Sequence, residues 1–299
     1  MKRYTASSWA RLVPLSHAYK QLRNDLMSWR YNARTPPDLP TFLDSVRALQ
    51  ASNLAIVIAF EQPWVLDWML RLARLNLRDC QPLVFDNSRS AEKRAEIAAV
   101  CARLGVPYLA LPLNQSRHPN RSHGMAMNWI YRHVITALKP QLFAYLDHDL
   151  IPLQPLSLAE QVGDQPFYGA KNPGIDAWNL WAGYCAFRFA QVAGKPVNFL
   201  YDFSRELDTG GRNWPVLYRQ VDEAALRFAS NEWLEFRPGD GADPGRVQVI
   251  DGAWLHIGGV SYGSNFKDKQ QLCTVLEALS TRGDSGAILT GRVLAQATQ

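Results

Sequence analysis

Apolar positions in the first half of the chain alternate between short continuous runs and longer stretches with helical spacing. Runs of strand length stand at 54–60, 82–85, 108–111 and 142–146. Helical periodicity covers 64–77, 91–104 and 124–138. Continuous apolar runs are typical of strands buried on both faces, and strands that alternate with such helices form βαβ units. The pattern therefore predicts an α/β fold with a mostly parallel sheet flanked by helices.

The pattern changes after Pro155. Short aromatic strands are expected at 167–169 and 184–187, followed by loops rich in glycine and tryptophan and a last helix near 270–279. We therefore divide the chain into a helical extension and linker (1–50), a first half (51–155), a second half (156–267) and a helical tail (268–299). Because ligands bind at the carboxyl ends of strands in open α/β sheets, we expect the first half to bind a nucleotide-like ligand and the second to shape the other substrate.

Residues 1–34 combine an apolar stripe with a net charge of +6, which exceeds the net charge of the whole chain. They hold seven basic residues and one acidic residue, whereas the whole chain of 299 residues has a net charge of +5. Apolar side chains recur at steps of three or four, at Trp9, Leu12, Leu15, Tyr19, Leu22, Leu26 and Trp29. We expect a helix from about Leu15 that ends before the prolines of 35–40. Such a helix either lies in an anionic membrane surface or docks on the body with its tryptophans in the core.

The composition excludes several classes of protein. A hydrophobic fraction of 47% argues against disorder. Because the chain beyond residue 34 is close to neutral, it lacks the basic stripe of a nucleic-acid binder, and we expect no nucleic-acid partner. No membrane-spanning apolar stretch or signal peptide is visible, so we expect a cytoplasmic protein, peripheral on the inner face of the membrane if 1–34 binds lipid. The four cysteines show no metal-binding spacing and are expected to be reduced and buried.

Two carboxylates stand where the fourth predicted strand leaves the sheet. Asp147 and Asp149 follow the apolar run 142–146. In an extended chain, side chains two residues apart project to the same side, so both carboxylates are expected at the ligand edge. Paired carboxylates suit Mg²⁺ or Mn²⁺ bound jointly with a diphosphate. Two solvated aspartates at a strand end are the alternative.

Two earlier segments carry further polar groups in suggestive positions. Asp86 and Asn87 follow the second predicted strand, where a carboxylate either contacts a ligand or forms a turn. Gly124, expected at a helix start, would let backbone amides approach an anion, and Arg121 would add positive potential. A plain helix cap by Ser122 is the alternative there.

In this order, the three segments resemble the nucleotide-sugar-binding half of family 2 glycosyltransferases with the GT-A fold, over about residues 53–155. The resemblance implies a single Rossmann-like sheet with a mixed acceptor-side half. It implies inverting transfer of a sugar from a UDP- or GDP-type donor to a hydroxyl of a glycan or lipid-linked acceptor. The donor-binding residues that it implies are Phe60, Asp86, Asn87, Arg121, Gly124 and Asp147. The ligands that it implies for Mn²⁺ or Mg²⁺ are Asp147, Asp149 and His256.

On the acceptor side, the resemblance implies an acidic base at Asp208, with Asp222 and Glu223 as alternatives. Trp181 and Gly183 lie in a segment that resembles the family's acceptor-side strand. The tryptophan either stacks on a sugar or fills the core. His256 either completes a metal site as a neutral imidazole or is structural.

Two other functions are alternatives. A sugar nucleotidyltransferase normally carries a basic, glycine-rich loop after its first strand, and the segment 60–64 contains neither glycine nor a basic residue. A non-catalytic nucleotide-sugar-binding module would retain the fold without turnover. Metal-dependent hydrolysis of donor sugars would separate an enzyme from such a module.

Overall fold

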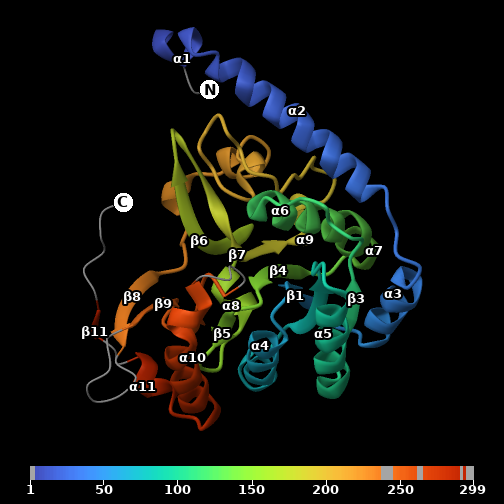
Figure 1. Ribbon diagram of the computed structural model, residues 1–299, viewed down its shortest axis with the longest axis vertical. Helices are drawn as coiled ribbons and strands as arrows, with labels where there is room; N and C mark the ends of the chain where they lie inside the picture. The colour runs from blue at the N-terminus through green and yellow to red at the C-terminus, as the bar shows by residue number, and fades with distance from the viewer. Residues whose placement is uncertain (1–3, 237–244, 261–264, 290–291, 294–299) are drawn as a thin grey trace.

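Strand β1 (Asn53–Ala59) lies in the middle of a six-stranded sheet, in a computed structural model that describes residues 4–236, 245–260, 265–289 and 292–293 (Figure 1). The strand order is β3-β2-β1-β4-β7-β6. The other members are β2 (Gln81–Asp86), β3 (Tyr108–Ala110), β4 (Leu142–Asp147), β6 (Phe167–Gly174) and β7 (Ala177–Arg188). Strands β1 to β4 are parallel, and β7 runs antiparallel to both β4 and β6. The expected mostly parallel sheet is confirmed.

Helices cover both faces of this sheet. Because side chains alternate along a strand, Ala55 and Val57 of β1 join the core beneath α4 (Pro63–Asn76) and α5 (Ala91–Leu104), whereas Leu54 and Ile56 face the opposite core. The opposite face is covered by α3 (Leu39–Ala48), α6 (Pro119–Ile130), a π-helical turn (Tyr131–Ile135) and α7 (Thr136–Leu138). Because helices cover both faces of the sheet, β1 needs apolar residues at successive positions. This explains the continuous apolar run at 54–60.

A second, antiparallel sheet extends the fold beyond the predicted one. Its order is β11-β8-β9-β10-β5, and its strands are β5 (Leu150–Pro152), β8 (Asn231–Phe236), β9 (Gly245–Ile250), β10 (Trp254–His256) and β11 (Arg292–Val293). Helices α10 (Asn265–Thr281) and α11 (Ser285–Leu289) lie beside it (Figure 1). The indole N–H of Trp68 on α4 donates to Ser280 on α10 at 2.9 Å, which ties this part to the central sheet.

The remaining elements are short helices and the N-terminal extension. The extension consists of α1 (Ala6–Ala10) and α2 (Val13–Asn32), which runs along the edge of the molecule (Figure 1). The short helices are α8 (Leu158–Val162), α9 (Phe189–Val192) and 3₁₀ turns at Gly211–Asn213, Tyr218–Gln220 and Glu223–Ala225. All four cysteines are free and buried, as expected. Within the described ranges, no helix is long and apolar enough to cross a membrane.

One predicted boundary is wrong. The helix expected at 124–138 begins at Pro119, where the side chain of His118 accepts the N–H of Arg121 as a cap. Gly124 is therefore not at the helix start but in the second turn. A Cβ atom at this position would lie 2.6 Å from the carbonyl oxygen of Phe199, so glycine allows α6 to approach that backbone closely.

We expect Gly124→Ala to lower the free energy of unfolding by about 1–3 kcal/mol in urea titrations, because the new methyl group meets backbone that cannot move aside. Gly286→Ala is the matched control: this helical glycine has nothing within 4 Å of its Cβ position, so the change should be neutral or slightly stabilising. Equal stability of the two variants would show that close packing at Gly124 is unimportant.

Candidate functional site

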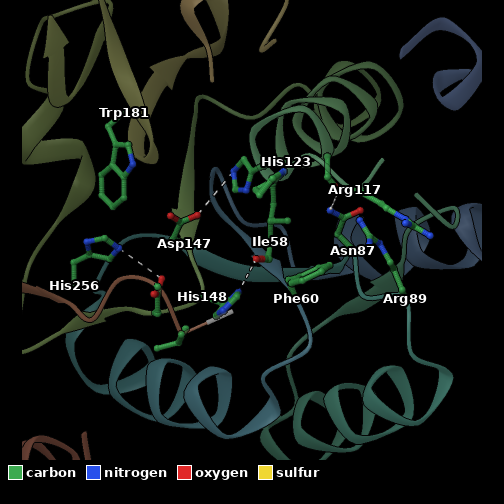
Figure 2. Close-up of a pocket in the computed structure, with 15 residues that line it drawn as sticks. Ile58, Phe60, Asn87, Arg89, Arg117, His123, Asp147, His148, Trp181 and His256 are labelled. Carbon is green, nitrogen blue, oxygen red and sulfur yellow. Dashed lines mark hydrogen bonds and ion pairs between the residues drawn. The ribbon is translucent and has the colours of Figure 1, made fainter. Parts of the chain in front are cut away.

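A cavity with a volume of about 440 Å³ lies at the carboxyl ends of β1, β2 and β4 (Figure 2). Asp147, Asp149, Trp181 and His256 line it on one side. Phe60, Asn87, Arg89 and Arg117 line the other. A smaller cavity of about 160 Å³ adjoins it and shares His123, Asp147 and Trp181. The edge predicted for ligand binding is therefore hollow.

Asp147 depends on the glycine of the neighbouring strand. It is the last residue of β4, and β7 pairs with β4 so that Leu146 lies opposite Tyr184. A Cβ atom on Gly183 would lie 2.4 Å from Oδ2 of Asp147 and 2.3 Å from the ring of Trp181. Only glycine at this position leaves room for both the carboxylate and the indole. The structure thus brings Gly183, Trp181 and Asp147 together.

The three predicted metal ligands converge. The ligand atoms of Asp147, Asp149 and His256 all lie within 4.8 Å of one another. His256 ends β10, which pairs with β5 so that His256 lies opposite Leu150, the residue after Asp149. Its Nε2 is 3.8 Å from Oδ1 of Asp149, while Oδ2 of Asp149 accepts the N–H of Gly258 at 3.1 Å. Strand β10 of the second sheet therefore places the side chain of His256 beside the two carboxylates at the end of β4.

A hydrogen-bonded chain sets the tautomer of His256. Its Nδ1 contacts the amide oxygen of Gln248, the residue opposite it on β9. The amide group of Gln248 in turn donates to Oδ1 of Asn231 at 2.8 Å, which assigns the orientation of the amide. Because an amide oxygen only accepts, Nδ1 of His256 carries a proton, and Nε2 is the ring nitrogen that faces Asp149. Metal-binding histidines are typically held in this way.

The electrostatics of the cluster favour a cation. Burial, and then the charge of Asp149, raises the pKa of Asp147 to about 6. His123 offers no compensating charge, because burial lowers its pKa to about 4. Its Nε2 lies 3.9 Å from Asp147 and has no hydrogen-bond partner among the described residues. Two carboxylates beside Nε2 of His256 form a donor set that fits a divalent metal ion.

The other side of the cavity carries positive charge that the sequence analysis did not identify. Arg89 and Arg117 line it, and the guanidinium of Arg89 lies 6.0 Å from the ring centroid of Phe60 and bonds to the carbonyl of Ser116. The carboxylate of Glu61 accepts the backbone N–H of Arg89 at 2.6 Å and fixes this loop against β1. Arg89 directly follows residues 86–88 at the end of the second predicted strand. Its position in the sequence could therefore have indicated a contact with the ligand.

Of the predicted donor-binding residues, Phe60, Asn87 and Asp147 line the cavity. The amide N–H of Asn87 donates to Ser122 at 3.0 Å, and its Oδ1 is buried without a described partner. A buried acceptor without a partner, in a residue that lines a cavity, is a candidate for contact with a ligand.

Asp86, Arg121 and Gly124 do not line the cavity. Asp86 is fully buried, and its carboxylate accepts the N–H of Ser88 and the hydroxyl of Tyr108. Arg121 points to the N-terminal extension instead, where it donates to Asn24 at 3.2 Å. Contacts within the protein explain the positions of Asp86 and Arg121.

Asp208 lines the smaller cavity, together with Asn120 and Thr209. Its Oδ1 accepts the side-chain N–H of Asn120 and, at 2.7 Å, the backbone N–H of Thr209. Neither alternative base lines the two cavities: Asp222 caps a 3₁₀ turn, and Glu223 pairs with Lys171. Of the three candidates, only Asp208 therefore lines one of these two cavities.

The two tryptophans of β7 differ in environment. Trp181 lines both cavities, and its ring centroid lies 4.7 Å from that of His256. Trp178 is buried against Tyr218 and Phe228 and fills the core. Trp181 is thus placed to contact a ligand, and Trp178 is not.

No family model and no curated protein matches the chain. Among solved structures, a mannosyltransferase from Pyrobaculum calidifontis in complex with GDP-mannose and Mn²⁺ is similar, with 10% sequence identity and a TM-score of 0.36. The match covers 58% of each chain, less than two thirds of that protein's length.

We expect Asp147→Asn to stabilise the metal-free protein at pH 8. The pKa of Asp147 is raised in the folded state, so ionisation destabilises the fold as the pH rises from about 4 to about 6, and asparagine removes this cost. The gain in unfolding free energy should be of order 1–3 kcal/mol at pH 8 and should vanish near pH 4, measured by urea denaturation in the presence of a chelator. Asp164→Asn, at an exposed position, should change little at either pH. A destabilised Asp147→Asn protein at pH 8 would contradict the electrostatic account.

Proposed function

We propose that the protein is a metal-dependent, inverting glycosyltransferase that moves a sugar from a UDP- or GDP-type donor to a hydroxyl of a glycan or lipid-linked acceptor. The observation that carries the proposal is the convergence of Asp147, Asp149 and His256 within 4.8 Å at the carboxyl edge of a parallel sheet, across a cavity from two arginines. A cation site that faces basic side chains suits a diphosphate, because each can neutralise part of its charge.

The metal site would be formed by Asp147, Asp149 and His256. Carboxylates suit either Mn²⁺ or Mg²⁺, and the protonated Nδ1 of His256 leaves Nε2 free to ligate. A divalent cation bound there would offset the charge that develops on the leaving diphosphate. Gln248 holds the imidazole in place, and Gly258 holds the carboxylate of Asp149.

The donor would occupy the cavity of about 440 Å³, a volume typical of small-molecule sites. Arg89 and Arg117 would bind phosphate oxygens, since guanidinium groups match their geometry. The ring of Phe60 would form a wall for the base, and Oδ1 of Asn87 would accept a hydrogen bond from a base N–H or ribose hydroxyl.

The acceptor would enter the smaller cavity, where Asp208 would act as general base. Asn120 and Thr209 donate to Oδ1 of Asp208 and orient the carboxylate, so that its other oxygen can take the proton of the acceptor hydroxyl. The acceptor oxygen would then attack the anomeric carbon as the diphosphate leaves from the opposite face. A positioned base of this kind contributes roughly 10²–10⁴ in rate. Trp181, which lines both cavities, would contact the transferred sugar.

The metal assignment is tested by Asp149→Asn, which keeps an acceptor for Gly258 and should therefore fold. In the unsubstituted protein, a matching nucleoside diphosphate sugar should raise the melting temperature only with Mn²⁺ or Mg²⁺ present, and metal-dependent donor hydrolysis should be measurable. Asp149→Asn should lose both the metal-dependent shift and at least about 100-fold of the hydrolysis rate, because a ligand to the cation is removed. Asp164→Asn serves as the exposed control.

Metal-dependent turnover that persists in Asp149→Asn would remove the site assignment. A donor that stabilises the unsubstituted protein but is neither hydrolysed nor transferred would instead indicate a binding module.

For Asp208→Asn, we expect kcat to fall by about 10²–10⁴ while the Kd values for donor and Mn²⁺ change by less than about twofold, because the residue acts only on the acceptor. Asp222→Asn should retain normal turnover, since Asp222 lines neither cavity. Calorimetric titrations and steady-state kinetics provide the two readouts. Loss of donor binding in Asp208→Asn, or loss of turnover in Asp222→Asn, would assign the base elsewhere.

A further inference from the structure

The N-terminal helices expose a continuous row of large apolar side chains. This outer apolar stripe consists of Trp9, Leu12, Leu15, Tyr19, Leu22, Leu26 and Trp29, which are between 46% and 70% exposed. It follows α1 and the whole of α2, a helix of 20 residues and so about 30 Å long. The stripe expected from the sequence is present, but its tryptophans are not in the core.

Helix α2 contacts the body through the polar side chains of Asn24, Asp25 and Ser28 and, near its end, through Met27 and Tyr31. Asn24 and Ser28 are buried, and the amide of Asn24 donates to the hydroxyl of Tyr201 at 2.9 Å. Asp25 pairs with Arg212. A surface helix normally buries its apolar face and exposes its polar one. In α2 the apolar stripe faces outward instead. Exposed apolar patches of this kind mark interaction sites, which indicates that another apolar surface covers the stripe.

The charge of the N-terminal segment indicates the kind of partner that covers the stripe. Arg11, Arg23, Arg30 and Arg34 are all exposed in this segment. Asp25, the single acidic residue within 1–34, is already paired with Arg212. Packing of a second copy through the same stripe would bring basic helices together without acidic residues between them, which is unfavourable. An anionic bilayer offers both acyl chains for the leucines and negative headgroups for the arginines, and tryptophan favours its interface.

We propose that α1 and α2 lie in the surface of an anionic membrane, with the outer apolar stripe inserted between the lipids. This surface is separate from the cavities, so lipid binding requires no donor or metal ion. The same helix contacts residues close in sequence to the lining of the smaller cavity: Arg121, which follows Asn120 on α6, donates to Asn24, and Arg212, four residues after Asp208, pairs with Asp25. If the proposed function holds, membrane binding would therefore fix the acceptor-side cavity relative to the bilayer.

The test is co-sedimentation of the full chain with vesicles of phosphatidylcholine alone or with about a third of phosphatidylglycerol. Binding is expected only to the anionic vesicles and should weaken at high salt. The double variant Leu15→Gln and Leu22→Gln should bind about tenfold or more weakly, as should Arg23→Glu with Arg30→Glu. Leu75→Gln is the matched control, because Leu75 is 73% exposed on α4, far from the stripe, and should bind normally.

Equal melting temperatures establish that these surface variants fold. No binding to anionic vesicles, or binding that Leu15→Gln with Leu22→Gln leaves unchanged, would overturn the proposal. A dimer in analytical ultracentrifugation that this double variant converts to monomer would overturn it in favour of a second copy. Because the assay contains no nucleotide sugar, its outcome is independent of whether the protein transfers sugar.

Discussion

Two carboxylates held close together at the end of β4 are the interaction on which the rest of the site depends. Burial, and then the charge of Asp149, raises the pKa of Asp147 to about 6, so the ionised form of Asp147 costs stability at neutral pH when no cation is bound. Gly183 provides the space for Asp147, and Gly258 holds Asp149 through its N–H. Buried carboxylates with raised pKa values cluster at functional sites, because a bound ligand offsets the stability that their burial costs.

The second sheet is explained by the same requirement. Strand β5 begins immediately after Asp149 and pairs with β10, which brings His256 to the two carboxylates. Strand β9 then places Gln248 opposite His256 and fixes the proton on Nδ1. The central sheet thus supplies the carboxylates, and the second sheet supplies the imidazole together with the group that orients it.

The sequence was most informative where burial dictates composition. Strand β1 is buried on both faces, so its continuous apolar run could be recognised, and Asp147 and Asp149 could be placed because they follow such a run. The second sheet was missed because β5 and β10 are only three residues long and β8 carries polar residues.

Residues whose orientation depends on distant contacts could not be placed from local pattern. Helix α6 begins five residues earlier than expected, which directs Arg121 to Asn24 of α2. The role of Arg89 depends on a loop held by Glu61, which is distant in sequence. For α2, the spacing of apolar residues revealed the stripe, but only the buried contacts of Asn24 and Ser28 show which face points outward.

We propose that Asp147, Asp149 and His256 together hold a divalent cation beside a diphosphate. Anomalous diffraction from crystals grown with Mn²⁺ and either UDP or GDP tests it most directly, because manganese is located without reference to activity. We expect a single strong anomalous peak among the three side chains, with the diphosphate between it and the side occupied by Arg89 and Arg117. A bound nucleotide with no peak there, or a peak elsewhere in the cavity, would contradict the assignment.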